Sequence, residues 1–162
     1  MNRKETLAQW ERLVHKWAKI LHVDGWEIDV AWMEENKEDW AMCWADSTNR
    51  IATIGLTLSY MSKKKSNETN TPPLERLAIH EVLHIVFRHA EDYLGEYLIG
   101  GLVADGNKLE ARKLVETHEE RTIEELTDTF YKAAKSGTIA LGLPGGAEDA
   151  DVQLKGVSGT DG

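Results

Sequence analysis

Residues 80–84 read His-Glu-x-x-His, which places two histidines four residues apart with a glutamate directly after the first. The surrounding stretch, residues 74–87, is apolar at most positions, and this indicates a buried helix. Four helical residues turn through about 400°, so the two imidazoles lie on one face, one turn apart. Polar side chains inside such a helix need partners, and a shared metal ion can provide one.

Two imidazoles at this spacing can bind one tetrahedral zinc ion. Glu81 flanks them and can accept a proton from a water bound at the metal. Residues 71–73, Thr-Pro-Pro, suit the start of a helix. The alternative is an ordinary core helix whose histidines are satisfied by hydrogen bonds. We expect a zinc site with His80 and His84 as ligands.

Composition excludes several classes of protein. The chain has 162 residues, 41% of them hydrophobic, enough for one domain with a buried core. A formal net charge of −9 argues against a nucleic-acid partner, because binding one needs a basic surface. No apolar run approaches the roughly 18 residues of a membrane span, so we expect no membrane partner. Cys43 is the only cysteine, which excludes an intrachain disulfide and a cysteine-ligated zinc finger and favours a cytoplasmic location.

Hydrophobic periodicity predicts the elements before the motif. Apolar residues at three- and four-residue steps predict a helix over residues 3–22. Alternating apolar residues then predict three strands joined by short turns, at 26–32, 40–45 and 50–59. Short turns favour a small antiparallel meander sheet. All six tryptophans fall between residues 10 and 44, and we expect them to pack in the core between the first helix and the sheet.

The second half of the chain is expected to be mainly helical. Residues 61–70 read as a solvated loop, followed by the motif helix over 73–93. A later helix is predicted over 107–135, with a possible break near Thr117 and an inward stripe formed by Val115, Glu119, Ile123, Leu126 and Phe130. Residues 136–162 are rich in glycine and lack extended periodicity. We therefore expect one α+β domain over 1–135 and a flexible acidic tail over 136–162.

A catalytic zinc ion usually has three protein ligands and one open position. His89 lies about 140° round the helix from His84 and cannot share the ion. The later helix offers Glu119, which lies on the inward stripe, where a carboxylate needs a partner. We expect Glu119 to be the third ligand, with Glu120 and His118 as alternatives. The same charged cluster could also be a solvated helix face.

On these residues the chain resembles the zincin metallopeptidases, and most of all the compact gluzincin-type members such as the minigluzincins and small phage or bacterial metallopeptidase-like proteins. The resemblance covers about residues 26–130 and rests on the strands, the motif at 80–84 and a second helix that begins near Glu119. It implies a zincin-like fold in which the two motif histidines and a glutamate of the second helix, here Glu119, hold zinc. It also implies that Glu81 is the general base and that an antiparallel edge strand lies beside the cleft.

The function that we expect is a zinc-dependent metallopeptidase that hydrolyses peptide bonds of a polypeptide substrate with a zinc-activated water. A cell-wall peptide or another amide is the alternative substrate class. A non-catalytic zinc-binding regulatory or interaction module is the alternative function, and a fourth protein ligand, such as His118 or Glu120 beside Glu119, would support it. Four residues are candidates for steadying the oxyanion: Tyr93, Tyr97, His118 and Tyr131.

Overall fold

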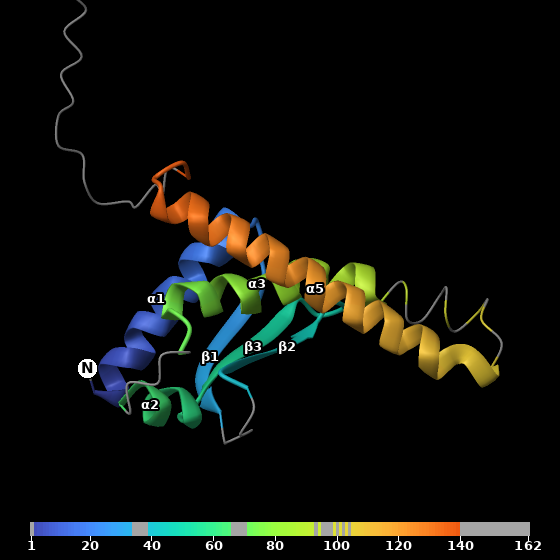
Figure 1. The fold of residues 1–162 in the computed structure, drawn as a ribbon, viewed down its shortest axis with the longest axis horizontal. Helices are drawn as coiled ribbons and strands as arrows, with labels where there is room; N and C mark the ends of the chain where they lie inside the picture. The colour runs from blue at the N-terminus through green and yellow to red at the C-terminus, as the bar shows by residue number, and fades with distance from the viewer. Residues whose placement is uncertain are drawn as a thin grey trace, which may run out of the picture.

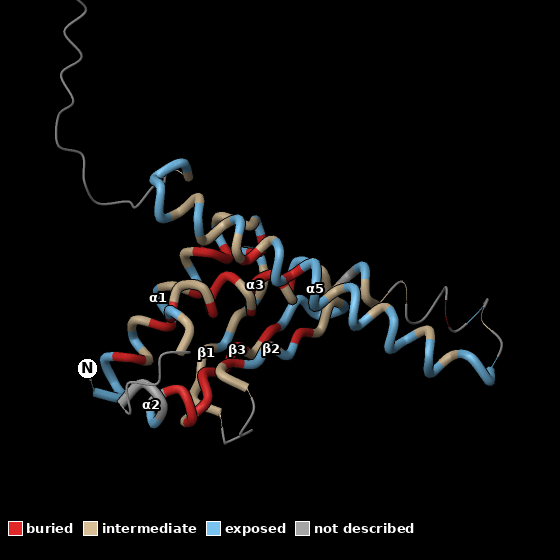
Figure 2. The backbone as a smooth tube through the Cα atoms, viewed as in Figure 1, coloured by how far each residue is buried: buried red, intermediate tan, exposed pale blue. Residues whose placement is uncertain are grey.

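The computed structural model of the protein describes residues 2–33, 39–65, 71–92, 94, 99, 101, 103 and 105–139. They form an α+β fold in which helices α1 and α3 pack on one face of a three-stranded sheet, and the long helix α5 crosses α3 on the side away from the sheet (Figure 1). Buried residues concentrate where α1, α3 and strand β3 meet, while α5 is mostly exposed (Figure 2). The predicted α+β class is confirmed.

The first helix, α1, spans Arg3–Ile20 and begins with a capping box between Asn2 and Glu5. Its apolar stripe buries Trp10, Val14 and Trp17 against the sheet and α3, as the three- and four-residue spacing predicted. The helix ends two residues earlier than predicted, just before His22, which has a φ of 59°. The chain then enters the sheet.

The sheet consists of β1 (Glu27–Met33), β2 (Ala41–Asp46) and β3 (Ile51–Thr57), in the order β1-β3-β2. Strand β2 pairs antiparallel with β3 through a hairpin, but β1 lies on the other side of β3 and runs parallel to it. The predicted antiparallel meander is therefore wrong. The most completely buried strand, β3, takes the centre of the sheet, whereas β1 and β2 carry exposed residues and take the edges.

Helix α2 (Leu58–Lys65) follows β3 without a loop. The predicted third strand over 50–59 therefore ends early, and the predicted loop at 61–70 is wrong for residues 61–65. The buried Tyr60 anchors α2, because its ring packs edge-on against Trp40 with 6.4 Å between the ring centroids. Residues 66–70 lie outside the described part of the chain.

Two long helices complete the fold. Helix α3 (Leu74–Asp92) carries the motif and contacts α1, β2 and α5. A short 3-10 turn (Asp105–Asn107) leads into α5 (Lys108–Lys135), which is continuous through Thr117, so no break occurs there. Helix α5 ends at Lys135, the last residue of the predicted domain, but Ile139 of the predicted tail also packs against the core. The rest of the predicted tail, 140–162, lies outside the described residues.

The tryptophans divide between the two sides of the sheet. Trp10 and Trp17 are fully buried, and three others are partly buried against the core, namely Trp26, Trp32 and Trp40. Trp44 is 60% exposed, so the prediction of core packing is wrong for it. The alternation of β2 explains the difference, because its helix-facing positions hold smaller residues, namely Ala41, Cys43 and Ala45. None of the described helices is long and apolar enough to cross a membrane.

We expect Ile54→Ala to lower the free energy of unfolding by about 2–5 kcal/mol, because Ile54 is fully buried at the centre of β3. Ile51→Ala is a matched control on the same strand, since Ile51 is 38% exposed and its truncation should cost less than about 1 kcal/mol. Urea unfolding of both variants measures the difference. Equal losses would contradict the central position of β3.

Candidate metal centre

Helices α3 and α5 bring the titratable side chains together. The apolar side of α5, which includes Ile123 and Leu126, packs toward the core and sets the rotation of the helix. Arg76 of α3 fixes the same rotation, because it pairs with Glu124 and donates to the Oδ1 atom of Asp128 at 3.0 Å. The consequence is that carboxylates at the margin of the apolar side of α5 face the histidines of α3.

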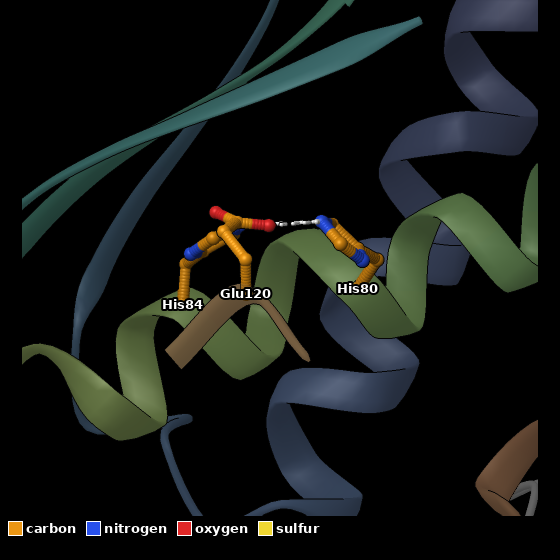
Figure 3. A group of neighbouring side chains, drawn as sticks. All are labelled: His80, His84 and Glu120. Atoms are coloured by element: carbon orange, nitrogen blue, oxygen red, sulfur yellow. Dashed lines mark hydrogen bonds and ion pairs between the residues drawn. The ribbon is translucent and has the colours of Figure 1, made fainter. Parts of the chain in front are cut away.

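His80 and His84 point their Nε2 atoms at each other, 3.3 Å apart. Two nitrogens bound to one zinc ion at about 2.05 Å and a tetrahedral angle would be about 3.3–3.4 Å apart. The carboxylate of Glu120 lies between the two rings (Figure 3), with Oε1 at 3.5 Å from Nε2 of His84 and Oε2 at 3.8 Å from Nε2 of His80. One donor atom from each residue lies within 4.8 Å of the others, so the three can hold one metal ion.

The other nitrogen of each imidazole also faces a carboxylate. Nδ1 of His80 lies 3.5 Å from Oε1 of Glu124, and Nδ1 of His84 lies 3.7 Å from Oε1 of Glu119. These separations are long for hydrogen bonds but place an anion behind each ring. Metal-binding histidines usually direct the nitrogen that does not bind the metal at such a partner, which fixes the tautomer and orientation of the ring. Glu119 and Glu124 therefore lie behind the rings, where they could orient them once a metal ion is bound, while Glu120 faces the common point.

Burial and charge favour cation binding at this point. Burial, with a smaller contribution from the neighbouring His84, lowers the pKa of His80 to about 4, so His80 is held in the neutral form that binds metals. Burial alone would lower the pKa of His84, but the surrounding carboxylates, with Glu119 first, raise it overall. Each imidazole thus lies among carboxylates that a bound cation would neutralise.

Glu81 is only 4% exposed and lies on α3 directly after His80. Burial raises its pKa to about 8; the charge of His84 opposes this rise, while Glu120 and Asp39 add to it. A carboxyl group with so high a pKa, next to candidate metal ligands, is the type of group that enzymes use for proton transfer.

Two pockets extend from the cluster along β2. One, of about 310 Å³, is bordered by Trp40, Ala41, His80 and Glu81. The other, of about 160 Å³, is bordered by Cys43, Ala45 and His84 together with several glutamates. The cleft therefore runs along β2, with the histidines between its two halves. Burial raises the pKa of Cys43 to about 12, so its thiol stays protonated in the metal-free protein.

The structure brings His80 and His84 together as predicted, but the carboxylate that it groups with their Nε2 atoms belongs to Glu120 and not to Glu119. The inward stripe correctly identified Glu119 as the more buried of the two, at 13% exposure of the side chain against 58%. The more buried Glu119, however, lies behind the ring of His84, next to its Nδ1 atom, and not beside the two Nε2 atoms. The sequence does contain a signal for Glu120. Glu120 and Glu124 are four residues apart, as are His80 and His84, so the two glutamates lie on one face of α5 and can face the two histidines.

The other candidates fall elsewhere. His118 borders an apolar cavity with Phe87 and Leu114. Tyr131 lies eleven residues beyond Glu120 in α5, about three turns away, where the ammonium group of Lys135 lies over its ring. Tyr93 and Tyr97 lie outside the described residues, and so does the side chain of His89. Within the described chain, no candidate for steadying the oxyanion lies at the cluster.

Comparisons with protein-family models, with curated proteins and with solved structures give no match. The resemblance to zincins thus stays an interpretation of the motif and of the order of the elements.

We expect Glu120→Ala to weaken zinc binding most, because it removes the carboxylate that faces both Nε2 atoms. Glu119→Gln and Glu124→Gln should each weaken binding by about 10- to 100-fold, the usual effect of losing a carboxylate behind a ligand. Competition with a chromophoric chelator measures all three affinities. Glu125→Gln is the control, since Glu125 is exposed and pairs with Arg121. A loss confined to Glu119→Gln would identify Glu119 as the ligand.

We also expect the burial of Glu81 to lower the free energy of unfolding of the metal-free protein as pH rises from about 4.5 to about 8, while the lowered pKa of His80 acts in the opposite direction up to about pH 6.5. The unfolded chain releases the proton of Glu81 near pH 4.5, whereas the folded chain holds it to about pH 8. Glu81→Gln should therefore match the wild type near pH 4 and exceed its free energy of unfolding at pH 8, by on the order of a few kcal/mol. Urea unfolding across this range measures the difference. A difference that is independent of pH would contradict the burial of Glu81.

Proposed function

We propose that the chain is a zinc-dependent metallopeptidase in which His80, His84 and Glu120 hold the ion and Glu81 is the general base. The observation that carries this proposal is the pair of Nε2 atoms 3.3 Å apart, faced by one carboxylate, with the buried Glu81 beside them. A bound zinc ion would lower the pKa of a water molecule and polarise the scissile carbonyl. The positive charge of the ion would favour the ionised form of Glu81, and this carboxylate would accept the proton of that water and deliver it to the leaving amine.

The number of donors favours a catalytic site over a structural one. Among the described residues, one carboxylate and two imidazoles converge on the point, and a tetrahedral ion would keep its fourth position open. Glu119, the residue that would have to close the site, faces Nδ1 of His84 instead. A structural zinc site usually has four protein ligands. This arrangement favours the peptidase over the non-catalytic module.

The backbone of β2 favours a polypeptide substrate. The N–H of Thr57 donates to the carbonyl of Trp40 at 3.1 Å, so Trp40 and every second residue after it direct their backbone groups toward β3. The N–H and C=O groups of Ala41, Cys43 and Ala45 then point to the outer edge, where none of the described strands pairs with β2. The same three residues border the two pockets. An extended peptide could add to this edge with its scissile bond beside the histidines.

We expect Glu81→Gln to fold, keep its zinc and lose about 10²–10⁴-fold in the hydrolysis of unstructured polypeptides, because glutamine cannot accept the proton. Mass spectrometry of a broad peptide library incubated with each zinc-loaded protein measures cleavage. A chelator should abolish the cleavage by the wild type, and zinc should restore it. Glu125→Gln serves again as the control, since Glu125 lies outside the cluster and should leave the rate unchanged.

If the zinc-loaded wild type cleaves no peptide that Glu81→Gln leaves intact, the peptidase proposal fails. Retained zinc with no hydrolysis would then support the non-catalytic binding module.

A further inference from the structure

Two large apolar side chains stand on the solvent-facing side of β2, at Met42 and Trp44. They are neighbours on the outer side of the strand whose other positions border the proposed cleft. An exposed tryptophan on an edge strand invites association with another chain. Because Met42 and Trp44 alternate along one strand with Ala41, Cys43 and Ala45, a peptide that paired with the edge beside the cleft would also lie next to them.

Strand geometry fixes where the side chains of an added peptide would lie. Successive residues of the peptide alternate between the two faces of the sheet. Those beside Ala41, Cys43 and Ala45 would point toward the pockets, and those beside Met42 and Trp44 would point outward. Opposite residues in paired strands have Cβ atoms about 4.5–5.5 Å apart, so an outward residue of the peptide would touch Trp44.

The charge of the cleft indicates which type of side chain the peptide would direct into it. The pocket of about 160 Å³ next to His84 is bordered by four carboxylates, from Glu91, Glu116, Glu119 and Glu120. Its one guanidinium, Arg88, is already paired with Glu91 at 2.7 Å and with Asp92 at 3.1 Å. With Glu120 assigned to the metal, Glu119 behind His84 and Glu91 paired with Arg88, the carboxylate of Glu116 is left for the substrate. A basic side chain complements it.

We infer that the preferred substrate is an extended peptide in which basic side chains, facing the acidic pocket, alternate with apolar ones that contact Met42 and Trp44, and that Trp44 selects the apolar side chain. The inference rests on the proposed function, because it uses the same edge and the same cleft. It assigns to Trp44 a specificity-determining role that does not involve the metal or the proton transfer.

The test uses the full chain with the Glu81→Gln change, loaded with zinc, so that peptides bind without being cleaved. The probe is a labelled peptide of about ten residues, long enough to pair with β2, that alternates serine and lysine. One serine at a time is replaced by leucine, and fluorescence anisotropy gives each affinity. We expect a leucine at one position to tighten binding about two- to tenfold, the size of one cross-strand contact to an aromatic ring. Replacing the lysines by glutamates should weaken binding.

Adding Trp44→Ala should remove the preference for leucine, whereas Trp44→Phe should retain most of it. Leu109→Ala is the matched control, because Leu109 is an exposed apolar residue in the first turn of α5 and does not lie on the sheet. In the cleaving wild-type background, Trp44→Ala should raise KM for the leucine peptide and leave kcat nearly unchanged, as expected when a binding contact is lost.

An unchanged preference for leucine after Trp44→Ala would overturn the inference, and so would an equal effect of Leu109→Ala. A change in oligomeric state on Trp44→Ala, without a change in peptide preference, would also overturn it. That result would identify the surface formed by Met42 and Trp44 as an interface between copies of the chain. Peptide binding that depends on Trp44, found together with an absence of hydrolysis, would support the inference while the proposed peptidase function fails.

Discussion

Helix α3 lies between the sheet, α1 and α5, so the side chains that it carries must find partners largely within the protein. Most of them are apolar and pack in the core, but His80, Glu81 and His84 are polar and carry a high cost of burial. Helix α5 offsets part of that cost, because its side chains Glu119, Glu120 and Glu124 face the two imidazoles. A metal ion would balance the remaining negative charge, which is why the cluster and the fold support the same interpretation.

The topology of the described strands leaves an open strand edge beside this cluster. Because β3 occupies the centre, β2 is left at an edge directly beside α3. The side chains of Ala41, Cys43 and Ala45 are small, so they leave room beside β2. A peptide could approach both the outward-pointing N–H and C=O groups of these residues and the histidines. With bulky residues in the same positions, the edge would be blocked. The exposed Trp44 is the consequence of placing the bulky residues of β2 on the other side.

Patterns within one element were readable from the sequence, and relations between elements were not. The stripes of α1 and α5 and the spacing of His80 and His84 identified three helices and the two imidazoles. Periodicity gives the faces of a strand but not its neighbour, so the parallel pairing of β1 with β3 was missed. On α5 the stripe identified the most inward carboxylate, Glu119, whereas the carboxylate that faces both Nε2 atoms lies at the margin of the stripe. Adjacent residues of a helix differ by about 100°. Only the crossing of α3 and α5 decides between Glu119 and Glu120.

Anomalous diffraction at the zinc edge, from crystals of the zinc-loaded protein, tests the central claim most directly. The account predicts one strong peak per chain, about 2.0–2.1 Å from Nε2 of both His80 and His84 and about 2.0–2.2 Å from a carboxylate oxygen of Glu120. The carboxylates of Glu119 and Glu124 should then lie behind the rings, near the two Nδ1 atoms. A peak coordinated by Glu119, a peak away from α3, or no peak at all would contradict the account.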